Sequence, residues 1–292
     1  MSARVLVFGA SGQVARALAA ARTPMTVTLA GRDRLDLAAA AAPAIAEFID
    51  AAAPDAVINA AAYTAVDRAE QEVEACGRLN RDAPSWIGEA CARRDIPFVH
   101  VSTDYVFDGE KGAPYVEDDA TGPLNVYGRT KAEGEHALQA LMAADARIAV
   151  IRTAWVFAPG GGFLDAMWRA AAERDEVLVV ADQWGSPTPA SGCADAALTL
   201  AAALLDRDPA AARLFHAAGA GASRADFAEA IFALAPRQPR LRRIAAADYP
   251  AAARRPRDTR LCSARLEARF GWRAPPLAEA LAACLGAAEA RA

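Results

Sequence analysis

A tyrosine and a lysine four residues apart, Tyr127 and Lys131, are the residues of this sequence best suited to proton transfer. They lie in LNVYGRTKAEGE, which continues into an Ala-, Glu- and Leu-rich run that predicts a helix. Positions i and i+4 share one helix face, about 6 Å apart. A free phenol has a pKa of about 10, and a fixed positive charge beside it lowers that pKa toward the working range. Tyrosine and lysine at this spacing also occur on ordinary helix surfaces, so the rest of the sequence must decide whether this pair is catalytic.

The first half of the chain alternates short apolar segments with helix-forming segments. Expected strands are residues 4–9 (RVLVFG), 27–30, 56–59 (AVIN), 97–102 (PFVHVS) and 148–152 (IAVIR). Expected helices follow the first strand, cover residues 38–53 and 80–94, and follow Tyr127. Strands that are apolar throughout and separated by helices are typical of a parallel sheet covered on both faces. The chain is therefore predicted to be an α/β protein with a Rossmann-type doubly wound parallel sheet.

The regular alternation ends after Val156. A glycine-rich loop at 159–162 and the turn-rich DQWGSPTPASG precede a helix at 191–205, a strand at 214–216 and helices at 225–234 and 277–285. We expect residues 1–155 to form an NAD(P)-binding domain to which residues 184–218 return. Residues 156–183 and 219–292 are expected to form a smaller C-terminal substrate-binding domain.

The composition excludes several classes of protein. Of 292 residues, 54% are hydrophobic and 23% charged, and no apolar run reaches about 18 residues, so no membrane partner is expected. Because MSARV leads directly into the first expected strand, no signal peptide is expected. Five scattered cysteines without a CxxC pair indicate reduced thiols in a cytoplasmic protein. The three histidines lack ligand-like spacing, so no structural zinc site is expected.

Positive charge is concentrated near the C-terminus. Residues 237–273 hold eleven arginines and three acidic residues, although the formal charge of the whole chain is −4. Such a stretch suggests an anionic small ligand or a surface of salt bridges. Nucleic-acid binding would need a broader basic face with interleaved aromatic residues, so no nucleic-acid partner is expected.

The turn after the first strand favours dinucleotide binding over a plain tight turn. Glycines let the backbone approach a pyrophosphate, and the next helix offers free N–H groups at its N-terminus. The residues expected to bind there are Gly9, Ser11, Gly12, Gln13 and Val14. The spacing departs from GxGxxG, with Ala15 in the third small position.

The end of the second strand bears on the choice of cofactor. An acidic residue there binds the 2′-hydroxyl of NAD, whereas an arginine accommodates the 2′-phosphate of NADP. Arg32 therefore favours NADPH, and NADH stays possible if Arg32 is a solvated loop residue. Asp36 and Leu37 are expected near the adenine.

Two further strand ends fall at the edge where open α/β sheets bind ligands. The third strand is followed by Ala62, Tyr63 and Thr64, which are expected to contact the cofactor. The small residues in this region leave room for a cofactor and also allow close packing of strand on helix, and both can hold. Thr103 and Asp104 close the fourth strand, where the hydroxyl could donate a hydrogen bond to a substrate carbonyl. A glycine turn, a strand-end hydroxyl and YxxxK, in this order, form the pattern of an extended short-chain dehydrogenase/reductase.

The resemblance to a known family covers nearly the whole chain. Segments similar to the dTDP-4-dehydrorhamnose reductase family are GASGQVA, VINAAAYTAVDRAE, STDYVFDG, PLNVYGRTKAEGE, RTAWVFAPGGGFL, DQWGSPTPA and RPRDTRL. The resemblance implies reduction of the 4-keto group of a nucleotide-linked 6-deoxysugar with NAD(P)H, the last step of dTDP-L-rhamnose synthesis. It also implies that Tyr127 is the proton donor, that Lys131 binds the nicotinamide ribose, and that Thr103 tunes the tyrosine.

The same resemblance implies a set of substrate contacts. Asp104 lies against the sugar and Trp155 stacks near it, where its flat apolar ring suits the 6-methyl group; core packing is the alternative. Arg255 and Arg257 flank Pro256, and we expect one of them to bind the substrate pyrophosphate bidentately. Surface salt bridges are the alternative for these arginines.

The chain departs from some members of the family. Where they place glutamates for a magnesium ion at a dimer interface, this chain has Ala17 and a C-terminal AAEARA without a clear matching acid. No metal is therefore expected, and the protein is expected to be a monomer or a homodimer. Two other functions stay open: a 4-ketoreductase for another nucleotide-linked deoxysugar, and a non-catalytic NADP-binding regulatory subunit. Retention of the tyrosine, lysine and threonine argues against the second.

Overall fold

The computed structural model describes the backbone of residues 2–289 and the side chains of residues 2–286. The side chains of the C-terminal AAEARA, in which the sequence offers no clear match for a metal-binding acid, lie outside the described residues.

A six-stranded parallel sheet forms the centre of the larger lobe, in the order β10-β5-β4-β3-β1-β2. Its strands are β1 (Arg4–Phe8), β2 (Thr26–Ala30), β3 (Ala56–Asn59), β4 (Phe98–Thr103), β5 (Ile148–Thr153) and β10 (Leu214–His216). The four central strands are buried along nearly their whole length, as apolar runs covered on both faces should be. The prediction of a doubly wound parallel sheet is confirmed.

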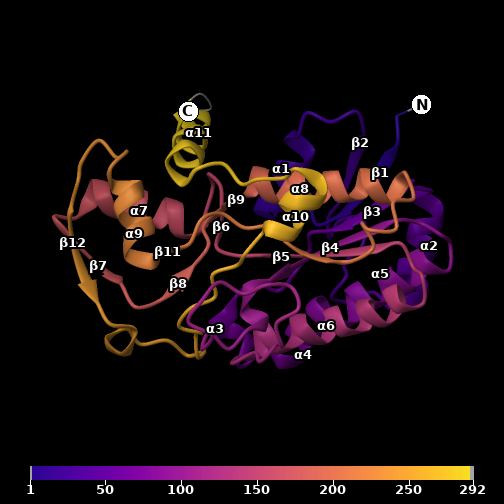
Figure 1. Ribbon diagram of the computed structural model, residues 1–292, viewed down its shortest axis with the longest axis horizontal. Helices are drawn as coiled ribbons and strands as arrows, with labels where there is room; N and C mark the ends of the chain where they lie inside the picture. Colours follow the sequence, from indigo (N-terminus) through magenta and orange to yellow (C-terminus); the bar gives the residue numbers. More distant parts are fainter. Residues whose placement is uncertain (1, 290–292) are drawn as a thin grey trace.

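Helices cover both faces of this sheet (Figure 1). One face packs against α1 (Gln13–Ala20), α8 (Ala190–Leu205) and α10 (Ala264–Phe270). The other packs against α2 (Ala42–Ala52), α5 (Ala83–Ala92) and α6 (Val126–Ala143). The expected helix at 38–53 begins later, at Ala42, because Pro43 has no N–H to donate and is tolerated only in a first turn.

Three short helices connect β3 to α5. They are α3 (Val66–Ala69), α4 (Val73–Gly77) and the π-helical turn η1 (Arg78–Asp82), which runs directly into α5. The expected helix at 80–94 is therefore the end of a longer composite segment. This segment packs against α6 and contacts the residues around Tyr127.

The C-terminal part forms a smaller lobe with its own apolar clusters (Figure 1). Its helices are α7 (Gly162–Glu173), α9 (Arg224–Phe232) and α11 (Leu277–Glu289), and its strands β7 (Glu176–Val180) and β12 (Arg240–Ile244) pair in parallel. Short strands β8 (Trp184–Gly185) and β11 (Ala222–Ser223) pair here, whereas β6 (Val156–Phe157) pairs with β9 (Thr188–Pro189). Single 3₁₀ turns lie at η2 (Asp104–Val106) and η3 (Ala246–Asp248).

We propose that these lobes are the two expected domains. Of residues 184–218, which were expected to return to the larger lobe, α8 and β10 lie in that lobe, whereas β8 pairs with β11 in the smaller lobe. Helix α10 is a second return, since its Leu266 belongs to the core beneath α1 and α8.

Helix α6 lies very close to its neighbours, and glycine makes this approach possible. A Cβ at Gly128 would overlap the backbone carbonyl of Tyr105, and one at Gly134 would overlap the carbonyl of Asn80 in η1. Asn125 begins the helix, with its Oδ1 accepting a hydrogen bond from the Gly128 N–H at 2.8 Å. These contacts fix the position and rotation of the helix that carries Tyr127 and Lys131.

The glycine at position 134 can be tested through stability. Gly134→Ala should lower the free energy of unfolding by about 1–3 kcal/mol, because the added methyl group meets a backbone carbonyl that cannot move away cheaply. Urea unfolding measures this change. Gly286→Ala in α11 is the matched control, since nothing lies within 4 Å of its Cβ position. Equal stability of the two variants would show that α6 does not need the close approach.

Candidate active site

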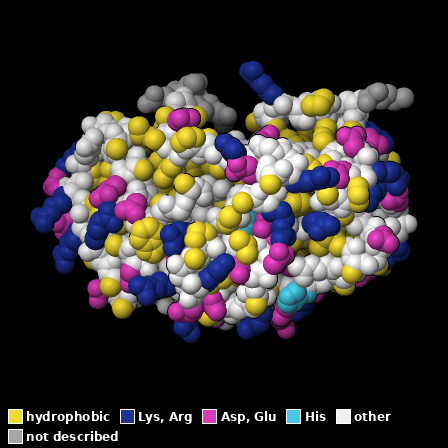
Figure 2. Space-filling view, viewed as in Figure 1, with side chains coloured by type: hydrophobic (Ala, Val, Ile, Leu, Met, Phe, Trp, Pro, Cys, Tyr) yellow, Lys and Arg dark blue, Asp and Glu magenta, His cyan; other side chains and the backbone are white. Residues whose placement is uncertain are grey.

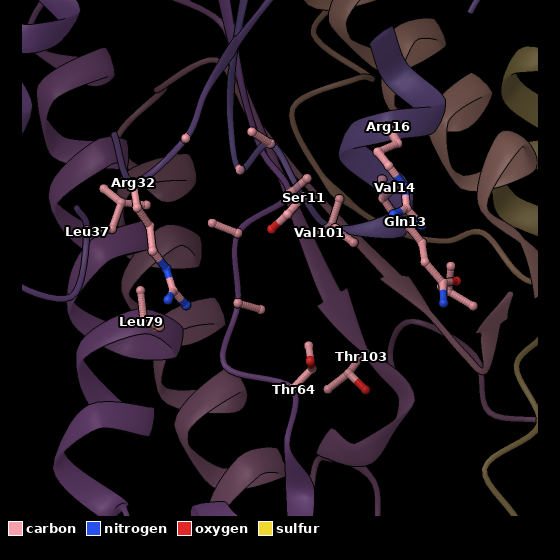
Figure 3. A pocket seen from close by; sticks show the side chains of 18 of the residues that line it. Ser11, Gln13, Val14, Arg16, Arg32, Leu37, Thr64, Leu79, Val101 and Thr103 are labelled. Carbon is pink, nitrogen blue, oxygen red and sulfur yellow. The ribbon is translucent and has the colours of Figure 1, made fainter. Parts of the chain in front are cut away.

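A cavity of about 870 Å³ opens at the carboxyl ends of the parallel strands. Its walls come from the β1–α1 turn, the ends of β2, β3 and β4, and α6 (Figure 3). Open α/β sheets bind ligands at this edge. Most of the residues predicted to bind cofactor or substrate line it: Gly9, Ser11, Gly12, Gln13, Val14, Arg32, Asp36, Leu37, Ala62, Thr64, Thr103, Asp104, Tyr127, Lys131 and Trp155.

The glycine turn has the shape that a diphosphate needs. Gly9 has a φ of 104°, a backbone conformation that L side chains rarely adopt, and its Cβ would lie 3.2 Å from the Ala61 nitrogen. A Cβ at Gly12 would point into open space, so the backbone there can be approached closely. The first turn of α1 has no side-chain cap, which leaves its N–H groups free for a ligand. Gln13 Oε1 is buried without a hydrogen-bond partner among the described residues.

The end of β2 forms the opposite part of the cavity. Arg32 reaches across toward Leu79 in η1 (Figure 3), and its guanidinium has no carboxylate partner among residues 2–286. Leu37 is buried, whereas Asp36 is exposed and accepts a hydrogen bond from the Ala38 N–H at 3.0 Å. An apolar wall with an unpaired guanidinium suits a phosphorylated adenosine.

Tyr63 is placed differently from its neighbours Ala62 and Thr64. It is not among the lining residues, and its hydroxyl donates to Glu72 Oε2 at 2.5 Å. Its backbone N–H donates to Asn80 Oδ1 at 2.9 Å. The tyrosine therefore holds the loop after β3 against α4 and η1.

Thr103, Tyr127 and Lys131 meet at one end of the cavity. Burial raises the pKa of Tyr127 well above its ordinary value, and a hydrogen bond with the Thr103 side chain partly opposes this effect. Lys131 is 1% exposed, and its Nζ donates to the Val101 carbonyl at 2.6 Å. Burial lowers the pKa of Lys131 to about 8. The expected lowering of the phenol pKa by the lysine charge is not seen, because desolvation outweighs the hydrogen bond with Thr103 and the nearby acidic groups raise the pKa further.

Asp104 lies beside this group and is itself buried. It accepts hydrogen bonds from Thr259 Oγ1 at 2.5 Å and from Thr103 Oγ1 at 3.1 Å. Burial raises its pKa to about 6, and the two hydroxyl donors oppose that shift. The carboxyl is thus closer to neutral than an exposed aspartate, and it holds the Thr103 hydroxyl in place.

Trp155 forms a rigid wall of the cavity. Its φ is 43°, an uncommon and strained value for a bulky residue. The Arg224 guanidinium lies over its ring, 3.7 Å from the ring centre. A Cβ at Gly185 would overlap the indole, so this glycine also gives the ring its space. Arg224 and the space left by Gly185, both in the smaller lobe, therefore hold Trp155 in place although its backbone conformation is unfavourable.

Arg255 and Arg257 do not line the cavity. Arg255 Nη2 pairs with Asp67 Oδ2 at 2.7 Å, and Arg257 is exposed. Within residues 2–286, nine of the eleven arginines of the basic stretch form ion pairs: Arg237, Arg240, Arg242, Arg243, Arg255, Arg260, Arg265, Arg269 and Arg273. Basic and acidic side chains are accordingly intermingled over the face seen in Figure 2.

Several buried polar residues around the site escaped the sequence analysis. Glu135 pairs with Arg152 at 2.6 Å and accepts a hydrogen bond from Ser102, which joins α6 to β4 and β5. His100 and Asn59 lie directly behind Lys131. The sequence feature that could have identified such residues is a single polar residue within an otherwise apolar strand, such as the histidine of PFVHVS.

The described residues hold no group of three or more His, Cys, Asp and Glu side chains arranged for a metal ion. In the same part of the chain, every helix is too short or too polar to cross a membrane.

The fold and the site define a Rossmann-type oxidoreductase of the extended short-chain dehydrogenase/reductase class. The chain matches the RmlD substrate binding domain family over residues 3–290. It is 43% identical over 280 residues to the dTDP-4-dehydrorhamnose reductase of Sinorhizobium fredii, with 93% of each chain covered. It is 36% identical over 277 residues to that of Escherichia coli, with 91% of each covered. The protein belongs to the dTDP-4-dehydrorhamnose reductase family.

Solved structures agree with this assignment. The dTDP-4-dehydrorhamnose reductase of Clostridium acetobutylicum superposes with a TM-score of 0.89 at 30% identity, over 98% of this chain and 99% of that one. The Bacillus anthracis enzyme in complex with NADP gives a TM-score of 0.90 at 27% identity, over 98% and 100%.

Proposed function

We propose that this protein reduces the 4-keto group of dTDP-4-dehydro-β-L-rhamnose to give dTDP-L-rhamnose, with NADPH as the preferred reductant and NADH as a possible second one. The observation that carries the proposal is that Thr103, Tyr127 and Lys131 converge on the cavity that also contains the glycine turn. The names of the relatives supply the substrate, and the NADP complex of the Bacillus anthracis enzyme supports the cofactor.

The lining of the cavity supports a dinucleotide bound along it. The glycine turn and the free N–H groups of α1 would hold the diphosphate, and Arg32 would pair with a 2′-phosphate. Asp36 and Leu37 would lie against the adenosine, and Lys131 against the nicotinamide ribose. A bound dihydronicotinamide supplies the hydride that reduces the ketone carbon.

Tyr127 and Thr103 act on the ketone oxygen. As negative charge builds on this oxygen, the phenol transfers its proton to it and the Thr103 hydroxyl donates a hydrogen bond. The raised pKa of Tyr127 keeps the phenol protonated until that charge develops. The Thr103 hydroxyl donates to Asp104 here, and rotation of its hydrogen about the Cβ–Oγ1 bond would direct the same donor to the substrate.

The sugar lies against Trp155. Its flat apolar ring suits the 6-methyl group, which has no hydroxyl to satisfy, and Arg224 behind the ring keeps it in place. Asp104 is available to a sugar hydroxyl. The substrate pyrophosphate extends toward Arg255 or Arg257, on the side of the site formed by the smaller lobe.

The cellular location and the oligomeric state of the protein are part of the same proposal. All five cysteines are free thiols, three of them buried, which suits the reducing cytoplasm, where sugar nucleotides are made. The protein is proposed to work there as a monomer or a homodimer.

The proton donor can be tested directly. Tyr127→Phe should lower kcat for NADPH oxidation with dTDP-4-dehydro-L-rhamnose by about 10²–10⁴-fold, because the ketone oxygen loses its proton source. The dissociation constant of NADPH, followed by its fluorescence, is the control and should stay nearly unchanged. Equal rates for the variant and the wild type would eliminate Tyr127 as the donor.

The arginine contact predicts an effect on substrate affinity. An Arg255→Ala/Arg257→Ala variant should raise KM for the nucleotide sugar about 10- to 100-fold, since charged hydrogen bonds to the pyrophosphate are lost. Asp67→Asn is the matched control, because it breaks the ion pair with Arg255 yet keeps both guanidinium groups. An unchanged KM in the double variant, or an equal rise in the control, would remove this contact from the account.

A further inference from the structure

Arg224, the first residue of α9, brings a partly buried positive charge to the substrate side of the site. Its guanidinium carbon lies 3.7 Å from the ring centre of Trp155 and 5.1 Å from that of Phe163. The same guanidinium contacts the Tyr105 hydroxyl. Tyr105 packs edge-on against Tyr127, with 5.8 Å between the two ring centres. Arg224 is therefore separated from the proposed proton donor by a single aromatic ring.

No carboxylate balances the charge of Arg224. Within residues 2–286, no Asp or Glu side chain forms an ion pair with its guanidinium. The nearby carboxylates are engaged elsewhere: Asp67 pairs with Arg255 at 2.7 Å, Asp226 pairs with Arg243 at 2.9 Å, and Asp104 accepts from Thr103 and Thr259. An arginine stays protonated in a protein, so its charge cannot be removed by titration. A desolvated charge without a partner is costly, and an anionic ligand would relieve that cost.

A second guanidinium lies close to the first. The Arg255 side chain contacts the same Tyr105 hydroxyl. Burial lowers the pKa of Arg224 from its ordinary value, and the neighbouring charge of Arg255 adds to this effect. Two guanidinium groups that share one hydroxyl repel each other, so their proximity is favourable only when an anion lies between or beside them. Guanidinium groups bind phosphate oxygens bidentately, which makes a diphosphate a suitable anion for this place.

We propose that Arg224, together with Arg255, binds the diphosphate of the nucleotide-sugar substrate. The C4 atom of the sugar must lie at Tyr127 to be reduced, and the diphosphate is attached to C1, across the six-membered ring from C4. The diphosphate is therefore expected about one ring away from Tyr127, on the side where Tyr105 and Arg224 lie. The inference deepens the proposed function and rests on it for the identity of the substrate. It gives Arg224 a role beyond its contact with Trp155.

Binding of dTDP to the NADP⁺-saturated protein tests the proposal without any turnover. This nucleotide has the diphosphate but no sugar, so the wall that Trp155 offers to the sugar does not contribute to its affinity. Arg224→Gln should raise the Kd of dTDP about 10- to 100-fold in isothermal titration calorimetry, because charged hydrogen bonds to phosphate oxygens are lost. The Tm and the Kd of NADPH should stay nearly unchanged, which shows that the variant is folded. UDP is measured beside dTDP, so that a preference for another base is not mistaken for the lack of a diphosphate site.

Arg243→Gln is the matched control, because it removes the charge of an exposed arginine in β12 of the same lobe. Its Kd for dTDP should equal that of the wild type. The proposal is overturned if Arg224→Gln binds the nucleotides as tightly as the wild type, if the control loses as much affinity, or if the wild type binds neither dTDP nor UDP.

A crystal structure of the wild type with NADP⁺ and dTDP decides the matter even if Arg224→Gln does not fold. We expect a phosphate oxygen within about 2.7–3.2 Å of an Arg224 nitrogen. A diphosphate bound beyond the reach of this side chain would contradict the proposal. These binding results involve neither the ketone nor the hydride, so they stand even if dTDP-4-dehydro-L-rhamnose proves not to be reduced.

Discussion

The close contact between α6 and the segments around it is the constraint on which the site depends. Without side chains at Gly128 and Gly134, the helix backbone reaches the carbonyls of Tyr105 and Asn80. The buried Glu135–Arg152 pair, with Ser102 beside it, joins the same helix to β4 and β5. A buried ion pair is expensive to desolvate and gives little net stability. We infer that its role is to fix the register of α6, so that Tyr127 and Lys131 face the end of β4.

Desolvation also shifts the pKa values of four ionisable groups around this end of the cavity. It raises the pKa values of Tyr127 and Asp104 and lowers those of Lys131 and His100. All four shifts favour neutral forms. The two groups proposed to donate to the ketone oxygen, the Tyr127 phenol and the Thr103 hydroxyl, are neutral, which suits a reaction in which negative charge appears on that oxygen. The part of the cavity proposed to bind phosphate instead offers backbone N–H groups and the guanidinium of Arg32.

Local patterns in the sequence were enough to predict the sheet and the order of its motifs. The apolar runs of β1, β3, β4 and β5 reflect burial on both faces, and the glycine turn and Tyr127–Lys131 pair keep their spacing in any Rossmann-type fold. The late start of α2 is the exception, although Pro43 signals it in the sequence. The irregular strands of the smaller lobe, two residues long in β8 and β11, are too short for any periodic signal.

Long-range interactions account for what the sequence did not reveal. Arg255 pairs with a residue 188 positions away, and no local pattern announces such a partner. The raised pKa of Tyr127 depends on how completely the fold desolvates it, whereas the sequence shows only the charge of the nearby lysine. Likewise, the orientation of His100 depends on an asparagine 41 residues earlier. These features require three-dimensional coordinates.

The most direct test of the account is a crystal structure of the protein with NADP⁺ and dTDP-L-rhamnose. The account predicts that Tyr127 Oη and Thr103 Oγ1 both lie about 2.6–3.2 Å from the sugar O4 atom, with Trp155 against the methyl group. A sugar bound with O4 beyond hydrogen-bonding reach of either oxygen would contradict it.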